Sequence, residues 1–232
     1  MSAYQIRESK RARRIRLQVT VDDGLVVVAP KGVRPEEVDI LVRSQHQWIN
    51  RALKKLADRK QYLSRQFGEG PPTTISLPAI NKTWRVSYFI NTDLAAGWDV
   101  SAHDSLNIYS EPSSAQMYIE KWLTSVARDH LHNELSLLSK KTGLSCKRMQ
   151  IRAQKSRWGS YSARGTISLN RNILFFQPAV VQYLLIHELC HTIHLNHSRD
   201  FWKLVETFCP DFRALDKSLK DAWRLLPPWS VK

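Results

Sequence analysis

The chain has 232 residues, 43% of them hydrophobic, a composition that is typical of a globular protein and not of a disordered one. It carries 35 Lys and Arg against 21 Asp and Glu, and the net charge of +14 favours acidic or polyanionic partners. No segment has the roughly 18 consecutive apolar residues of a membrane span, and the N-terminus lacks the apolar core of a signal peptide. With only three Cys residues, these features predict a cytoplasmic protein without membrane contact.

Alternating residues predict a β-hairpin near the N-terminus. Arg14–Thr20 alternates polar and apolar residues, Asp22-Asp23-Gly24 supplies a turn, and Leu25–Ala29 forms the return strand. A run of basic residues precedes and enters this hairpin: Arg7, Lys10, Arg11, Arg13, Arg14 and Arg16. These charges are expected on the open face of a sheet, where they form either a nucleic-acid-binding surface or an ordinary solvated one.

A long helix is predicted to follow the hairpin. Pro35 suits its first position, apolar residues continue at helical spacing, and Gly68 and Gly70 mark its end or a boundary. Trp48 adjoins the apolar stripe and is predicted to be a packing residue. Residues 73–110 then read as short strands separated by turns. Residues 1–112 are therefore predicted to form a β-rich N-terminal region with one long helix.

Residues 113–232 are predicted to form a second domain that contains both helices and strands. A long amphipathic helix begins at Ser113 and ends near Gly143, because Gly commonly ends helices. His130 and His132 lie two apart on it and point to different faces, so we interpret both as structural. The remaining predicted elements are strands at 147–152 and 166–170, joined by a turn that contains Gly, and helices from about 178, at 198–208 and at 212–226.

The segment His187-Glu188-Leu189-Cys190-His191 reads H-E-x-x-H within a mostly apolar stretch that favours a helix. Residues i and i+4 lie on the same helical face, so the imidazoles of His187 and His191 can reach one metal ion. Glu188 leaves the same turn, where a carboxylate can take the proton of a metal-bound water. The motif therefore predicts a zinc site with Glu188 as the catalytic general base.

A third metal ligand is expected close to this motif. His197 follows six residues after His191, and Asn196 can adopt the left-handed conformation that would turn His197 back toward the ion. Glu206, in the helix predicted at 198–208, is the alternative ligand. We prefer His197 because it needs only one local turn. Three imidazoles leave one coordination position open, which is typical of catalytic zinc.

Several residues near the motif are assigned supporting roles. Cys190 is predicted to be a small packing residue, and His194 to lie beside the ligands or in solvent. Arg157, Tyr161 and Tyr183 are candidate donors to a developing oxyanion, although a structural role is expected for each. The predicted strand Thr166–Asn170 precedes the metal helix, and an extended substrate could pair with its edge.

Four segments together resemble the YgjP-like family of zinc metallopeptidases, which is related to the SprT-like and WLM metalloprotease domains. They are Trp158-Gly159-Ser160, Ile167–Asn170, His187–His191 and Asn196–Trp202. The likeness extends to the N-terminal hairpin and so covers most of the chain. It implies an α+β fold, with a zincin-like half (helix, small sheet and H-E-x-x-H helix) and a β-rich N-terminal half. It also implies His187, His191 and His197 as metal ligands and Glu188 as the base.

We therefore expect a zinc-dependent metallopeptidase that hydrolyses bonds of a peptide or protein substrate by means of a metal-activated water. The alternative function belongs to a different class. The basic N-terminal face could make this a nucleic-acid-associated binding protein whose metal site is structural or vestigial, and such binding would weaken steeply with salt.

Overall fold

A computed structural model of the chain describes residues 4–9, 12–20, 24–67, 70–90, 95–101 and 104–230. It contains helices together with three small sheets, so the predicted mixed α+β class is confirmed. The chain divides into two compact units, Met1–Gly68 (unit 1) and Glu69–Lys232 (unit 2).

Unit 1 is built on a three-stranded sheet with the order β1-β3-β2. The predicted hairpin is present as β2 (Arg16–Thr20) paired antiparallel with β3 (Gly24–Ala29), while its expected turn at Asp22-Asp23 lies outside the described residues. β1 (Tyr4–Glu8) pairs in parallel with β3 on the other side and was not predicted. β3 is consequently the central strand, which explains why Leu25–Ala29 is buried throughout.

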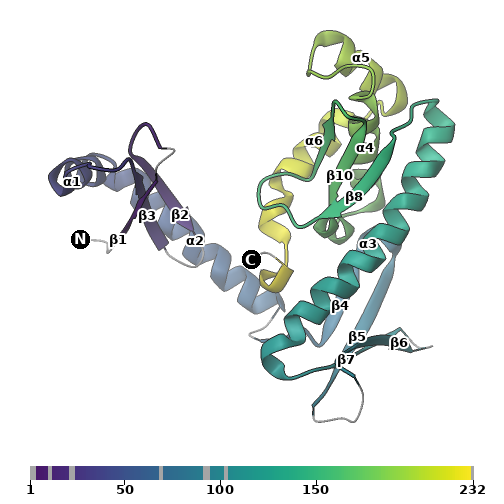
Figure 1. Cartoon of the computed structure of the whole chain (residues 1–232), viewed down its shortest axis with the longest axis horizontal. Helices are drawn as coiled ribbons and strands as arrows, with labels where there is room; N and C mark the ends of the chain where they lie inside the picture. Colours follow the sequence, from purple (N-terminus) through teal and green to yellow (C-terminus); the bar gives the residue numbers. More distant parts are fainter. Residues whose placement is uncertain are drawn as a thin grey trace. The chain divides into compact units, whose positions relative to one another are not determined.

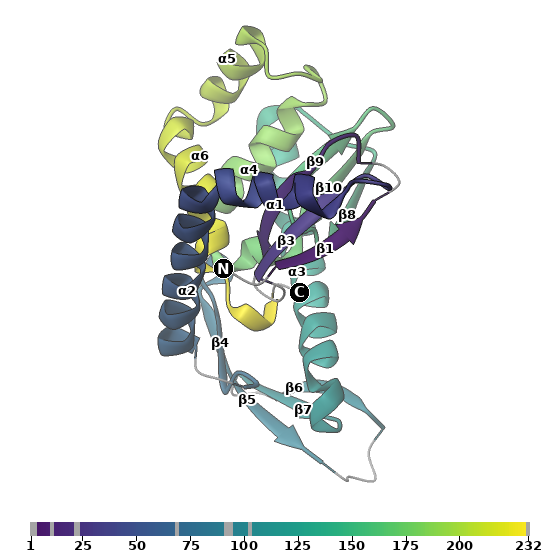
Figure 2. The same ribbon diagram turned by 90° about the vertical axis from the view of Figure 1, so that its left-hand side faces the viewer.

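The helical part of unit 1 consists of two helices where one was predicted. α1 (Pro35–Ser44) ends at Gln45, whose backbone leaves the helical region, and α2 (His46–Phe67) begins directly after it. Figure 2 shows the two helices meeting at a sharp bend. Trp48, expected to pack, is 41% exposed, whereas its neighbour Ile49 is buried.

Unit 2 begins with a four-stranded sheet of order β4-β5-β7-β6. Its strands are β4 (Thr74–Leu77), β5 (Lys82–Phe89), β6 (Gly97–Ser101) and β7 (Ser105–Tyr109). The long helix α3 (Pro112–Thr142) runs from this sheet at one end to the next sheet of unit 2 at the other, as Figure 1 shows. Gly143 ends the helix in the left-handed conformation, as its position predicted.

The unit boundary at Gly68 differs from the division predicted after residue 112. The reason is a shared core: apolar residues of the four-stranded sheet belong to the same buried cluster as those of α3 and of the elements that follow. Trp84 from β5 meets Trp122 from α3 edge to face, with ring centroids 5.1 Å apart. The strands therefore pack with the helix that follows them in sequence.

The remainder of unit 2 holds a second sheet and three helices. β8 (Arg148–Arg152), β9 (Gly159–Ser162) and β10 (Thr166–Asn170) have the order β8-β10-β9, with β10 parallel to β8 and antiparallel to β9. The 3-10 turn η2 (Arg171–Phe175) leads to α4 (Pro178–Cys190), which is followed by α5 (Arg199–Phe208) and α6 (Phe212–Asp221). The 3-10 turns η1 (Pro78–Ile80), η3 (Ala222–Leu225) and η4 (Pro228–Ser230) complete the set.

None of the helices that the structure describes combines the length and the apolar character needed to cross a lipid bilayer.

The shared core gives a first prediction. Trp122 is 2% exposed, so Trp122→Ala is expected to lower the free energy of unfolding of unit 2 by about 3–5 kcal/mol. Leu137 on the same helix is 60% exposed, and Leu137→Ala is expected to change the free energy of unfolding by about 0.5 kcal/mol or less. Urea unfolding of both variants measures the difference, and equal losses would contradict a core shared between α3 and the sheet.

Candidate metal centre

The H-E-x-x-H motif lies at the C-terminal end of α4. Pro178 occupies the start of this helix, where its missing N–H costs nothing, and the following residues are almost all apolar. The helix packs against α3, α5, α6 and β9, and it is buried on most of its surface. A helix that is apolar all round is fixed in both position and rotation by its neighbours, so the polar motif is held rigidly.

Three imidazoles converge at the end of this helix. The nitrogens that His187, His191 and His197 offer lie within 4.8 Å of one another. The Nε2 atoms of His187 and His197 are 3.1 Å apart. His187 and His191 come from one face of α4, while His197 comes from the loop after it. The structure therefore brings together the three imidazoles that the sequence analysis selected.

Neighbouring groups fix which nitrogen of each α4 imidazole faces the cluster. The Nδ1 of His191 lies 2.8 Å from the carbonyl oxygen of His194, to which it can donate when it carries the proton. Nδ1 of His187 lies 3.5 Å from the hydroxyl of Tyr183, which donates in turn to Asp216 at 3.0 Å. These contacts leave Nε2 of both rings available as an acceptor, the arrangement that metal-binding histidines use.

The phenyl ring of Phe201 supports all three imidazoles. It is fully buried, stacks on His191 at 4.5 Å between centroids, and meets His187 and His197 edge-on at 4.9 Å. Its position follows from the start of α5, where the Ser198 hydroxyl accepts a hydrogen bond from the Phe201 N–H at 3.3 Å.

The turn that delivers His197 differs from the predicted one. Asn196 does not have a positive φ, so the predicted left-handed conformation is wrong. Instead, its side-chain oxygen accepts a hydrogen bond from the N–H of Ser198 at 3.3 Å. Asn196 thus shapes the turn through its side chain, as Asn commonly does in loops.

The protein environment keeps the α4 imidazoles neutral. Burial, followed by the proximity of His191 and His197, lowers the pKa of His187 to about 3. Burial also lowers the pKa of His191, against the opposing effect of its hydrogen bond to His194. Neutral imidazoles retain the lone pairs that metal binding needs, so these shifts suit a metal site.

Glu188 is buried beside the imidazoles, and burial raises its pKa to about 8. Among the described residues its Oε2 has no hydrogen-bond partner, and its Oε1 side lies against β9. A Cβ added to Gly159 would stand 2.4 Å from Oε1 and 2.9 Å from Cδ of Glu188. Position 159 therefore requires glycine for lack of space, although its backbone is one that other residues adopt.

Two pockets flank this carboxylate, and both are lined by Arg157, Gly159, His187 and Glu188. One, of about 360 Å³, extends toward the stacked rings of Trp158 and Trp223, with ring centroids 3.8 Å apart. The other pocket, of about 240 Å³, extends toward Tyr161 and the exposed side chain of Leu195. The carboxylate thus lies between two spaces, each large enough for a side chain.

The three candidate oxyanion donors all line these pockets but differ in their contacts with other residues. The hydroxyl of Tyr183 is committed to Asp216, and burial together with that carboxylate raises its pKa. Tyr161 lines the smaller pocket. Arg157 lines both, and its guanidinium has no ion pair within the described chain. Its backbone carbonyl accepts a hydrogen bond from Nδ2 of Asn170 at 3.1 Å.

Other candidates lie outside the imidazole cluster. The carboxylate of Glu206 faces Arg213 at 3.8 Å, and His194 contributes its backbone carbonyl in place of its ring. Cys190 is fully buried, as predicted, and burial raises the pKa of its thiol to about 12. Phe201, Asp216 and Gly159 were given no role from the sequence. Of these, Gly159 and Phe201 lie in segments that carry the family resemblance, whereas Asp216 does not.

The predicted pairing of a substrate with β10 is wrong. β10 is the central strand, so both of its edges are occupied, by β8 and β9. β9 is an edge strand of this sheet within the described residues, and its Gly159, Ser160 and Tyr161 line the pocket beside the imidazoles. β9 is therefore the strand whose edge is open next to the site.

Comparison with protein families gives a match to the family described as YgjP-like, metallopeptidase domain, over residues 13–222. The chain belongs to the YgjP-like family. The match includes the imidazole cluster, Glu188 and the sheet beside them, as well as most of unit 1.

Among solved structures, this YgjP-like chain is similar to the crystal structure of the metallopeptidase zymogen of Pyrococcus abyssi abylysin. The two are 28% identical, the similarity covers 41% of this chain and 94% of that one, and the TM-score is 0.36. No curated protein matches the sequence.

The residues of the YgjP-like site fit a metal ion. Three nitrogen donors converge, and a buried carboxylate beside them has an oxygen without a partner among the described residues. Burial raises the pKa of Glu188, and no positive charge of the described residues offsets that effect. A dication would supply that charge and favour the ionised carboxylate.

The geometry predicts which substitutions release the metal. His197→Ala removes one of three converging donors and is expected to lower metal content strongly at limiting metal concentration, measured by atomic emission after dialysis. His194→Ala and Glu206→Ala are matched controls that should retain it, because neither side chain reaches the cluster. Full occupancy in His197→Ala together with loss in Glu206→Ala would show that the third ligand is Glu206.

Proposed function

We propose that this protein is a zinc-dependent peptidase in which unit 2 provides a zincin-like catalytic half. His187, His191 and His197 would hold the ion, and Glu188 would be the general base. The observation that carries the proposal is the convergence of three imidazole nitrogens within 4.8 Å next to a buried carboxylate oxygen without a partner. Membership of a metallopeptidase family supports peptide or protein substrates.

Zinc held by three imidazoles supplies a Lewis acid that acidifies water and polarises a peptide carbonyl. Glu188 performs the proton transfers. Its unpartnered Oε2 accepts a proton from the attacking water and afterwards delivers it to the leaving amine.

The substrate would lie along β9 as an extended strand. Strand addition to this open edge supplies main-chain hydrogen bonds and needs no particular sequence. The two pockets on either side of Glu188 would then receive side chains from either side of the scissile bond. The pocket beside Trp158 and Trp223 suits an apolar side chain. Arg157 has no ion pair among the described residues and suits a carbonyl or carboxylate oxygen of the substrate.

The nucleic-acid-binding alternative gains no support from the comparisons. Arg13, Arg14 and Arg16 are exposed in unit 1, which a solvated basic surface explains equally well. The family match names a peptidase domain and nothing that binds nucleic acid. The peptidase is therefore the only function proposed.

Glu188→Gln tests the proposed base. Gln keeps the size of the side chain but cannot accept the proton, so hydrolysis of an unfolded protein should fall by about 10²–10⁴-fold while zinc stays bound. The matched control is Glu206→Gln, which changes an acid outside the cluster and should leave both unchanged. Undiminished hydrolysis by Glu188→Gln, with its zinc retained, would exclude Glu188 as the base.

Gly159→Ala tests the placement of that base. The new methyl group would meet Oε1 of Glu188 at 2.4 Å, so the carboxylate must shift, and a displacement of about 1 Å can cost on the order of 10²-fold in rate. Zinc content should persist, because no imidazole is touched. Gly97→Ala is the matched control, since its Cβ would meet nothing nearer than 3.8 Å. Equal activities of the two variants in a protein-digestion assay would refute the steric requirement.

A further inference from the structure

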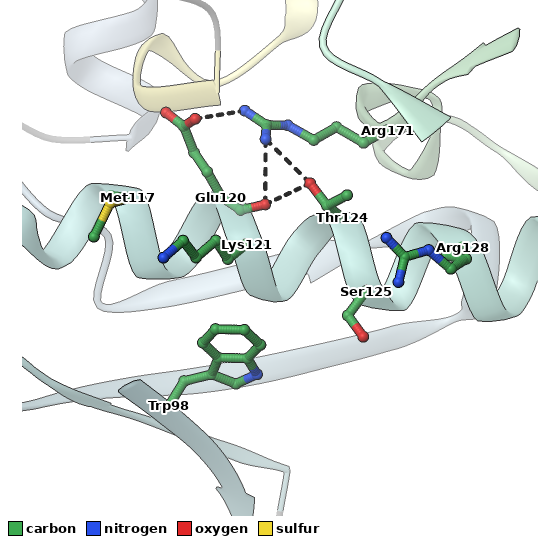
Figure 3. Close-up of a pocket in the computed structure, with 8 residues that line it drawn as sticks. All are labelled: Trp98, Met117, Glu120, Lys121, Thr124, Ser125, Arg128 and Arg171. Atoms are coloured by element: carbon green, nitrogen blue, oxygen red, sulfur yellow. Dashed lines mark hydrogen bonds and ion pairs between the residues drawn. The ribbon is translucent and has the colours of Figure 1, made fainter. Parts of the chain in front are cut away.

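Another pocket of unit 2 shares no residue with the two beside Glu188. It lies between helix α3 and strand β6 and has a volume of about 390 Å³. We name it the α3–β6 groove. Its lining residues are Trp98, Met117, Glu120, Lys121, Thr124, Ser125, Arg128 and Arg171, all shown in Figure 3.

Two free cations lie along the α3 side of the groove. Lys121 and Arg128 are seven residues apart, two turns of helix, and both are exposed. Within the described chain, neither makes an ion pair, and the amine of Lys121 lies 5.0 Å from the ring centroid of Tyr118. The hydroxyl of Ser125 lies between them along the helix and also lines the groove.

The acidic residue in the lining is already neutralised. The carboxylate of Glu120 pairs with Arg171 at 2.7 Å, and that guanidinium also donates to the Thr124 hydroxyl at 3.1 Å. Figure 3 shows Glu120 and Thr124 turned toward Arg171, on the opposite side of α3 from Trp98. The uncompensated charge of the groove is therefore positive.

The strand side of the groove is an exposed sheet edge. β6 is the last strand in the order β4-β5-β7-β6, so among the described residues only β7 pairs with it. Trp98 and Val100 alternate along β6 and are 37% and 49% exposed. Asp99 points to the other face, where it accepts hydrogen bonds from Asn107 and Tyr109 at 2.8 and 2.7 Å. An apolar edge of this kind readily accepts another strand.

We propose that the α3–β6 groove binds an extended, acidic segment of a protein substrate, outside the catalytic site. The segment adds as a strand to the open edge of β6, which supplies main-chain hydrogen bonds, and its acidic side chains pair with Lys121 and Arg128. Main-chain pairing provides affinity, and charge complementarity selects acidic sequences. The role as a substrate-binding surface rests on the proposed peptidase function, whereas the binding itself does not.

The binding test uses the full chain treated with EDTA, so that no peptide is cleaved. The probes are fluorescein-labelled 12-residue peptides of alternating Glu and Thr or of alternating Lys and Thr, followed by fluorescence anisotropy. The Glu peptide should bind at low salt and weaken as salt is raised, and the Lys peptide should not bind. Absence of Glu-peptide binding would overturn the proposal.

Charge reversal locates the site. Lys121→Glu/Arg128→Glu should weaken Glu-peptide binding at least tenfold. Lys140→Glu/Lys141→Glu, an equal change of charge at the exposed end of the same helix, should weaken it far less. Equal losses would mean that net charge and not the groove attracts the peptide. A 12-residue oligothymidylate that binds the groove when the Glu peptide does not would also overturn the proposal, in favour of nucleic acid.

Backbone methylation tests strand addition. Only every second residue of an added strand directs its N–H toward β6. Glu–Thr peptides N-methylated at every Glu or at every Thr should therefore differ, one of them losing binding at least tenfold. Identical behaviour of the two peptides would contradict pairing with the strand edge.

The link to the peptidase is tested separately, by hydrolysis of succinylated casein with the zinc-loaded chain. Lys121→Glu/Arg128→Glu should raise KM several-fold without changing kcat, since the groove is remote from the reacting bond. An unchanged KM would remove the role in substrate binding. If no hydrolysis occurs with the unaltered chain, the proposed function fails, and the peptide-binding result still decides whether the groove is a binding site.

Discussion

The phenyl ring of Phe201 is the contact on which the site depends. Three imidazoles from two segments must face one point, and the 3.1 Å contact between Nε2 of His187 and Nε2 of His197 joins only two of them. Phe201 gives each of them a surface to pack against, and its own burial fixes its position. Ser198 caps the helix that carries Phe201, and the packing of Phe201 on His187 and His191 joins the first turn of α5 to the end of α4. The cluster is thus preorganised by apolar packing.

Burial has opposite effects on the two kinds of titratable group at the site, and both effects suit a cation. Desolvation lowers the pKa values of His187 and His191, which keeps them neutral, and raises that of Glu188. The imidazoles thereby keep lone pairs for a metal ion, and the carboxylate has no compensating positive charge. A dication with a bound water molecule would satisfy both. β9 limits the freedom of the carboxylate from the other side, through the contact between Gly159 and Glu188.

Much of this arrangement could be predicted from local sequence patterns. The H-E-x-x-H helix, the strand Thr166–Asn170 and the stop at Gly143 follow from periodicity and glycine chemistry, and all three are present. Strand order could not be predicted, because pairing is decided by contacts between distant segments. β9 was therefore taken for a turn, and β10 for an accessible strand. The break at Gln45 was missed for a related reason, since the apolar stripe continues across it.

The open edge of β9 also bears on what such an enzyme can attack. A chain segment can lie along β9 only if its own amides and carbonyls are free, because a strand inside a folded sheet has already used them. Well-packed proteins would resist cleavage, whereas loose termini, long loops and damaged or incompletely folded chains would be cleaved. The same rule would protect the interior strands of the protein's own sheets. The share of a target's backbone amides and carbonyls that are already hydrogen-bonded would therefore limit its cleavage, whatever its side chains.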